Sequence, residues 1–150
     1  HMVWPTHCEI GTWGHNIHAD VLHACNVWEQ RHGRHTEKII KGSNPYTEHY
    51  SALIAEVPHD ADPNTQLNRQ LLESLAQADT LLVAGEAGSH CVKATMEHYV
   101  QYMDADAPKR IVLLTDCMSP VGGFESAHAD FLQRMAAIGV RCETSTSFDL

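Results

Sequence analysis

The chain has 150 residues, of which 43% are hydrophobic and 19% are charged, and this balance is typical of a globular domain with a buried core. The net charge of −9, with no basic stretch, argues against nucleic acid as a partner. No hydrophobic run reaches the roughly 20 residues that a membrane-spanning helix needs, and no signal peptide is recognisable, so we expect neither membrane insertion nor secretion.

The number and spacing of the cysteines indicate the redox state of the compartment in which the protein is expected. There are five of them, an odd number at irregular spacings and without a CxxC pair. Such a pattern does not make a disulfide framework. It predicts a protein of the reducing cytoplasm.

The first third of the chain differs in pattern from the rest. The chain opens with an irregular loop over 1–14, which is rich in ring side chains and glycine, and continues with a helix over about 16–31 that Gly33 stops. A short strand over 36–41 then ends at Gly42. The later expected elements are helices over about 62–78, from 91 to about 103 and from about 125 to 138, and strands over 80–84, 110–115 and 140–144.

This alternation of strands and helices predicts an α/β fold, a mostly parallel sheet with helices on its faces. We interpret residues 1–150 as a single domain.

The segment Leu81–Lys93, LLVAGEAGSHCVK, joins a hydrophobic strand to a helix through a turn of small residues. Cys91 stands where the helix begins, and the positive end of the helix dipole there favours a reactive thiolate. Unpaired backbone N–H groups of the turn are available to stabilise an oxyanion. An isolated cysteine is more often a small core residue, but this position favours a nucleophile for covalent acyl transfer.

Twelve histidines are many for this length, and several lie in or just after the first expected helix. Their spacing gives no regular set of ligands on one face, so a solvated polar face is the simpler interpretation. A histidine-rich metal-binding protein remains an alternative.

Three ordered segments together resemble the isochorismatase-like cysteine hydrolase superfamily, and within it the nicotinamidase-type amidases. They are WPTHCEIGTWG (residues 4–14), IKG (40–42) with YSA (50–52), and GEAGSHCVKAT (85–95). Leu53 stands where the family commonly has Phe. The resemblance implies a three-layer Rossmann-like parallel sheet with helices on both faces.

The resemblance also implies catalytic roles. Cys91 is expected to attack a small, nicotinamide-like carboxamide and to form a thioester with release of ammonia, while Lys41 assists beside the thiol. A cis peptide bond is expected between Glu86 and Ala87, so that the backbone N–H groups of Ala87 and Cys91 form the oxyanion hole. Glu86 itself is either a carboxylate facing the pocket or only a turn residue.

Further site residues follow from the same resemblance. His7 matches a histidine that helps to hold a divalent metal, often zinc, and imidazole suits that role. Trp4, Trp13, Tyr50 and Phe124 are expected to wall a flat pocket for the ring of the substrate. Family members commonly form dimers or tetramers, so we expect a homo-oligomer.

One catalytic residue of the family has no match here. Its general-base aspartate lies on a strand that precedes the Trp-Pro segment, and only three residues precede that segment here. We therefore expect the chain to be the C-terminal part of a longer hydrolase, with the aspartate on a missing N-terminal segment or a second polypeptide. The aspartates at 62, 104, 106 and 116 are no obvious substitutes; Asp116, at a strand end, is the nearest candidate, and a turn role suits it better. The alternative is a non-catalytic scaffold subunit or pseudoenzyme.

Overall fold

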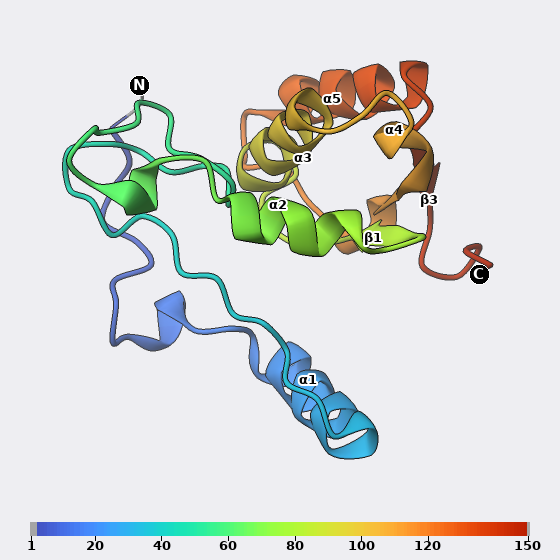
Figure 1. The fold of residues 1–150 in the computed structure, drawn as a ribbon, viewed down its shortest axis with the longest axis horizontal. Helices are drawn as coiled ribbons and strands as arrows, with labels where there is room; N and C mark the ends of the chain where they lie inside the picture. The colour runs from blue at the N-terminus through green and yellow to red at the C-terminus, as the bar shows by residue number, and fades with distance from the viewer. Residues whose placement is uncertain (1–2, 150) are drawn as a thin grey trace. The chain divides into compact units, whose positions relative to one another are not determined.

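The computed structural model describes residues 3–149, and the chain divides into two compact units, with the boundary in the sequence between Ile39 and Ile40 (Figure 1). The first unit contains the 3-10 helix η1 (Trp13–His15) and the helix α1 (Ala19–His32). The ring of His18 accepts a hydrogen bond from the Asp20 N–H at the start of α1. Gly33 ends the helix in the left-handed region, at φ 61°, as the sequence predicts.

The second unit has a sheet of three parallel strands in the order β1 (Leu81–Val83), β2 (Ile111–Leu114) and β3 (Arg141–Glu143). The helix α3 (Cys91–Tyr102) connects β1 to β2, and α5 (Glu125–Ala137) connects β2 to β3. In the order β1-β2-β3, two successive crossovers of the same hand place both helices on the same face of the sheet, and Figure 1 shows α3 and α5 side by side. The predicted parallel α/β fold is confirmed.

The core of this unit lies between the central strand and its helices. Ile111, Val112 and Leu113 of β2 are fully buried. Ile111 and Leu113 belong to one hydrophobic cluster with side chains from α2 (Arg69–Ala76), α3, α4 (Ala107–Arg110), α5 and the loops: Leu53, Leu72, Val92, Met96, Tyr99, Ala107, Met118, Phe131, Met135 and Val140. Burial of this cluster, about 25 cal/mol for each Å² of apolar surface, fixes α3 against the sheet and with it the position of Cys91.

Two expected elements differ from the structure. The helix expected over 62–78 is divided into the 3-10 helix η2 (Pro63–Thr65) and α2. Asp62 caps only η2, and α2 has its own cap, since the side chain of Asn68 accepts from the Leu71 N–H. The Asn68 N–H donates to the Leu53 carbonyl at 2.7 Å, so a contact distant in sequence replaces the helical hydrogen bond that the pattern predicts.

The strand expected over 36–41 is wrong, because this segment has no regular secondary structure. Within residues 3–149 it pairs with no strand of the sheet, and an extended segment becomes a β-strand only through such pairing. Two further short elements, α4 (Ala107–Arg110) and η3 (Thr115–Cys117), lie on either side of β2. No helix of the described chain is long and apolar enough to cross a membrane.

Candidate active site

Cys91 is the first residue of α3 and follows the turn that leaves β1. The turn contains the expected cis peptide bond between Glu86 and Ala87, and Gly85 has φ +121°, which a side chain would disfavour. The Ala87 carbonyl accepts hydrogen bonds from the N–H groups of His90 and Val92. The N–H groups of Ala87 and Cys91 donate to no residue in the described part of the chain. Two donors beside a thiol are therefore available to an oxyanion.

The loop after β2 holds this turn in place, a role that the sequence does not reveal. Four hydrogen bonds join the two segments: Gly85 N–H to Cys117 O (2.9 Å), Gly88 N–H to Ser119 O (2.8 Å), Ser119 N–H to Glu86 Oε2 (3.1 Å) and Val121 N–H to Ser89 Oγ (2.9 Å). Glu86 thus acts as a turn residue, the second of the two interpretations that its position left open.

Lys41 lies beside the thiol. Its Nζ is 3.6 Å from Cys91 Sγ and donates a hydrogen bond of 2.6 Å to the main-chain carbonyl of His49. The next residue, Gly42, has φ +76° and donates its N–H to His49 Nδ1 at 3.3 Å. Lys41 is half-buried, so its ammonium is held close to the sulfur atom of Cys91.

The segment that follows packs on α3. The Ala52 N–H donates to Thr95 Oγ1 at 3.0 Å, and that hydroxyl donates to the Cys91 carbonyl at 2.7 Å. Ser51 and Leu53 are fully buried, so Leu53 is a core residue at the position where the family commonly has Phe. This packing joins the segment that carries Lys41 to the helix that carries Cys91.

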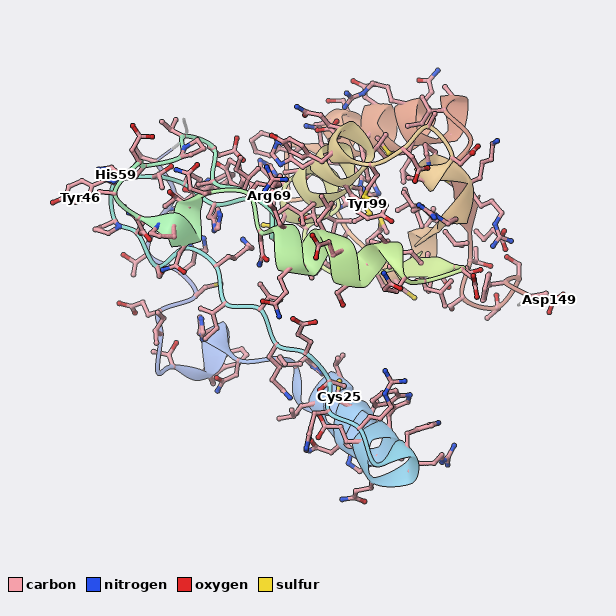
Figure 2. All side chains as sticks on the ribbon, viewed as in Figure 1. Cys25, Tyr46, His59, Arg69, Tyr99 and Asp149 are labelled. Atoms are coloured by element: carbon pink, nitrogen blue, oxygen red, sulfur yellow. The ribbon has the colours of Figure 1, made fainter. Side chains whose placement is uncertain are left out.

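A pocket of about 350 Å³ lies along α3, and neither Cys91 nor Lys41 is among its lining residues. Figure 2 shows the side chains of the described residues as sticks. Two predicted pocket residues, Tyr50 and Phe124, line the pocket together with His90, which sequence reasoning missed. The His90 ring centroid lies 5.4 Å from that of Tyr50 and 4.6 Å from that of Phe124. Burial, and then the Lys93 charge, lower the pKa of His90, which favours the neutral form of its ring.

The other predicted site residues belong to the first unit. Trp13 is 88% exposed, and the exposed His7 donates from Nδ1 to the Pro5 carbonyl at 2.7 Å. Nowhere in residues 3–149 do three His, Cys, Asp or Glu side chains come together to hold a metal ion. The described residues therefore do not fit the divalent metal that the resemblance implies at His7.

Asp116, the nearest candidate for a general base, is used elsewhere. Its two carboxylate oxygens accept from the N–H (2.7 Å) and the hydroxyl (2.6 Å) of Ser145, beyond β3. These two hydrogen bonds lower the pKa of Asp116. It links the ends of β2 and β3, a longer-range role than the local turn that we expected.

Solved structures share this arrangement of elements. A yeast nicotinamidase, Pnc1p, bound to the inhibitor nicotinaldehyde superimposes with a TM-score of 0.70 and 19% identity, over 97% of this chain and 60% of that one. An Acinetobacter baumanii nicotinamidase pyrazinamidase gives 0.59 and 23%, over 96% and 60%. A Pyrococcus horikoshii pyrazinamidase in complex with zinc gives 0.60 and 19%, over 95% and 63%.

The chain thus spans about three fifths of the length of these structures. No protein-family model and no curated protein sequence matches it. At 19–23% identity the likeness shows the fold. The chain has the isochorismatase-like, nicotinamidase-type α/β fold that its three sequence segments predict.

Proposed function

We propose that the chain belongs to a cysteine amidohydrolase that cleaves a small, nicotinamide-like carboxamide to a carboxylate and ammonia. The observation that carries the proposal is the 3.6 Å approach of Lys41 Nζ to Cys91 Sγ, at the start of a helix and beside two N–H groups without a described acceptor. The nicotinamidases and pyrazinamidases of the same fold support this reaction class.

The chemistry follows from these groups. The Cys91 thiolate attacks the amide carbon, and the negative charge that develops on the oxygen is stabilised by the N–H groups of Ala87 and Cys91. The C–N bond then breaks, the nitrogen takes up the proton that the thiol lost, and ammonia leaves. Water adds to the thioester carbon, the C–S bond breaks, and the acid is released with regeneration of the thiol.

The proton needs a carrier between the thiol and the leaving nitrogen. We propose an aspartate on a missing N-terminal segment or a second polypeptide, since Cys91 has no hydrogen bond to a carboxylate within residues 3–149. The free edge of β1 supports this, because β1 pairs only with β2 in the described sheet. Loss of a general base lowers a rate about 10²–10⁴-fold, so the 150 residues alone should be nearly inactive.

A scaffold subunit or pseudoenzyme of the same fold is the second candidate, and the same lack of a carboxylate at Cys91 among the described residues favours it. The two candidates differ in the expected reactivity of the Cys91 thiol, because a scaffold does not need a reactive cysteine. A zinc site at His7 would require ligands from outside the described residues. Trp4 and Trp13 as pocket walls, the cytoplasmic location and the homo-oligomer stay predictions.

Nicotinaldehyde tests the nucleophile without the missing base. Its aldehyde carbon accepts the Cys91 thiolate, a C–S bond forms, and the oxygen takes a proton from water, so no leaving group has to be protonated. We expect iodoacetamide at neutral pH to label Cys91 about ten times faster than the exposed Cys8, and nicotinaldehyde to slow only the labelling of Cys91. Equal labelling of both cysteines, without protection, would favour the scaffold.

A further inference from the structure

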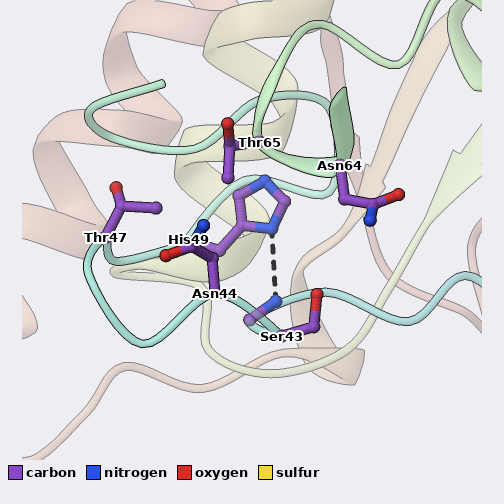
Figure 3. Close-up of a pocket in the computed structure, with 7 residues that line it drawn as sticks. Ser43, Asn44, Thr47, His49, Asn64 and Thr65 are labelled. Atoms are coloured by element: carbon purple, nitrogen blue, oxygen red, sulfur yellow. Dashed lines mark hydrogen bonds between the residues drawn. The ribbon is translucent and has the colours of Figure 1, made fainter. Parts of the chain in front are cut away.

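His49 is a buried histidine next to the proposed site that the reaction itself does not use. It is only 9% exposed and lines a cavity of about 10 Å³ with six other residues: Gly42, Ser43, Asn44, Thr47, Asn64 and Thr65. Figure 3 shows its ring between the neighbouring chain segments, with one ring nitrogen directed at the backbone of the 42–43 segment. Nδ1 of this ring has a hydrogen-bond partner, whereas the buried Nε2 has none among the described residues.

The hydrogen bond to Gly42 defines the protonation of the ring. The Gly42 N–H donates to Nδ1, so Nδ1 carries no proton and the ring is neutral, with its hydrogen on Nε2. Burial first, and then the charge of Lys41, lower the pKa of His49, in agreement with a neutral ring. The carboxylates of Glu48 and Asp62 act in the opposite direction.

The same residue also receives the Lys41 side chain. The His49 main-chain carbonyl accepts from Lys41 Nζ at 2.6 Å, while its ring holds the N–H of the adjacent Gly42. His49 therefore holds the start of the loop of residues 42–48 through two hydrogen bonds. Its ring accepts from the Gly42 N–H, and its main-chain carbonyl accepts from the Lys41 ammonium. With both hydrogen bonds formed, Lys41 Nζ lies 3.6 Å from Cys91 Sγ.

We propose that His49 is a positioning residue: its ring fixes the backbone at Gly42 so that the Lys41 ammonium stays beside Cys91. The inference rests on the proposed function, because it concerns how the same thiol is activated. It adds a residue that makes no contact with the thiol and acts only through Lys41.

The experiment measures the rate of Cys91 alkylation by iodoacetamide at pH 7, peptide by peptide, in folded protein. His49→Leu keeps the main-chain carbonyl but removes the ring acceptor, and His49→Asn keeps an acceptor at the position of Nδ1. Lys41→Met removes the ammonium and defines the full effect on the alkylation rate, which we expect to be about tenfold. Circular dichroism establishes that each variant is folded.

We expect His49→Leu to lower the rate at least threefold, within the tenfold limit of Lys41→Met, and His49→Asn to stay within twofold of the parent. In the Lys41→Met background His49→Leu should have no further effect, because its route to the thiol is absent. The inference is overturned if His49→Leu does not change the alkylation rate, or if it lowers the rate equally in the Lys41→Met background. It is also overturned if His49→Asn lowers the rate as much as His49→Leu. If Lys41→Met itself changes nothing, the proposed role of Lys41 fails, and the inference with it. If His49→Leu does not fold, His49→Asn decides, both alone and combined with Lys41→Met. A tenfold loss of alkylation rate for His49→Asn that is also found in the Lys41→Met background contradicts the inference.

Discussion

The Nζ atom of Lys41 lies 3.6 Å from the Sγ atom of Cys91, although the two residues are 50 positions apart. Lys41 comes from a segment without regular structure, and Cys91 opens α3. Their approach depends on His49, which receives the ammonium, and on Thr95, which receives the Ala52 N–H. The pairing of cation and thiol is thus a product of packing between a loop and a helix.

Lys41→Met should slow Cys91 alkylation at pH 7 by up to about tenfold, because a neighbouring cation favours the reactive thiolate. The rate should recover at alkaline pH, where the thiol ionises without assistance. The matched control is Lys109→Met, since Lys109 is an exposed lysine paired with Asp106 at 2.6 Å. A pH–rate profile for iodoacetamide measures both variants, and identical profiles for parent and Lys41→Met would contradict the prediction.

Gly88→Ala should disturb the turn before Cys91. Gly88 is buried, and a Cβ built on it overlaps the His128 ring. Overpacking of this kind costs about 1–3 kcal/mol of unfolding free energy, and we expect slower Cys91 alkylation as well. Gly122→Ala is the control, because a Cβ there meets nothing within 4 Å and should change stability by less than about 0.5 kcal/mol.

Removal of the His128 ring tests whether this side chain is what limits Gly88→Ala. His128→Ala combined with Gly88→Ala should recover part of the lost alkylation rate, since the new methyl group then has space. Urea unfolding and iodoacetamide labelling of the two single variants and the double variant measure the coupling. Strictly additive losses would show that the Gly88 backbone, and not His128, limits the substitution.

Thr95→Val should loosen the segment that follows Lys41. The substitution preserves shape but leaves the half-buried Ala52 N–H without its acceptor, which costs about 1 kcal/mol, the low end of the range for a buried donor. Thr95→Ser keeps the hydroxyl and should lose less. Urea midpoints compare the two variants, and a Thr95→Val protein as stable as Thr95→Ser would mean that this hydrogen bond contributes little.

Asp116→Asn should leave Cys91 alkylation and any amide hydrolysis unchanged, because its carboxylate is engaged by Ser145 and not by the thiol. The assay is ammonia release from nicotinamide and pyrazinamide by the chain with any partner polypeptide that copurifies. A loss of about 10²-fold or more would identify Asp116 as the general base after all.

Stability should fall as the pH decreases below about 6.5. Burial lowers the folded-state pKa of His49 and of His90 below the unfolded value near 6.5. In the window from 6.5 down to the folded-state pKa the unfolded chain binds more protons, so the free energy of unfolding decreases with falling pH. Urea midpoints at pH 7 and about pH 5.5 measure this effect, above the range in which most carboxylates titrate.

His49→Asn serves as the control for this pH effect, because it keeps an acceptor for the Gly42 N–H without a titrating ring. Its midpoint should depend less on pH than that of the parent protein. An equal dependence in both proteins would assign the effect to His90 or to other groups.

Local pattern was sufficient for much of the fold. The run before Gly85 is β1, the repeat after Cys91 is α3, and Gly33 ends α1, because strand and helix periodicities and a left-handed glycine act within a few residues. The turn at Glu86 and Ala87 has the cis peptide bond that the family resemblance implied.

Tertiary structure decided the rest, since it depends on partners distant in the chain. The expected strand over 36–41 lacks a pairing neighbour among the described residues, and the Asn68–Leu53 hydrogen bond divides the expected helix over 62–78. His90 in the pocket and His49 behind Lys41 carry no motif that would single them out. The sequence by itself determined a strand, a turn and a helix that begins at Cys91, and a lysine at position 41. Only the folded chain placed the two side chains 3.6 Å apart, because a distance between separate segments is set by packing and not by local preference.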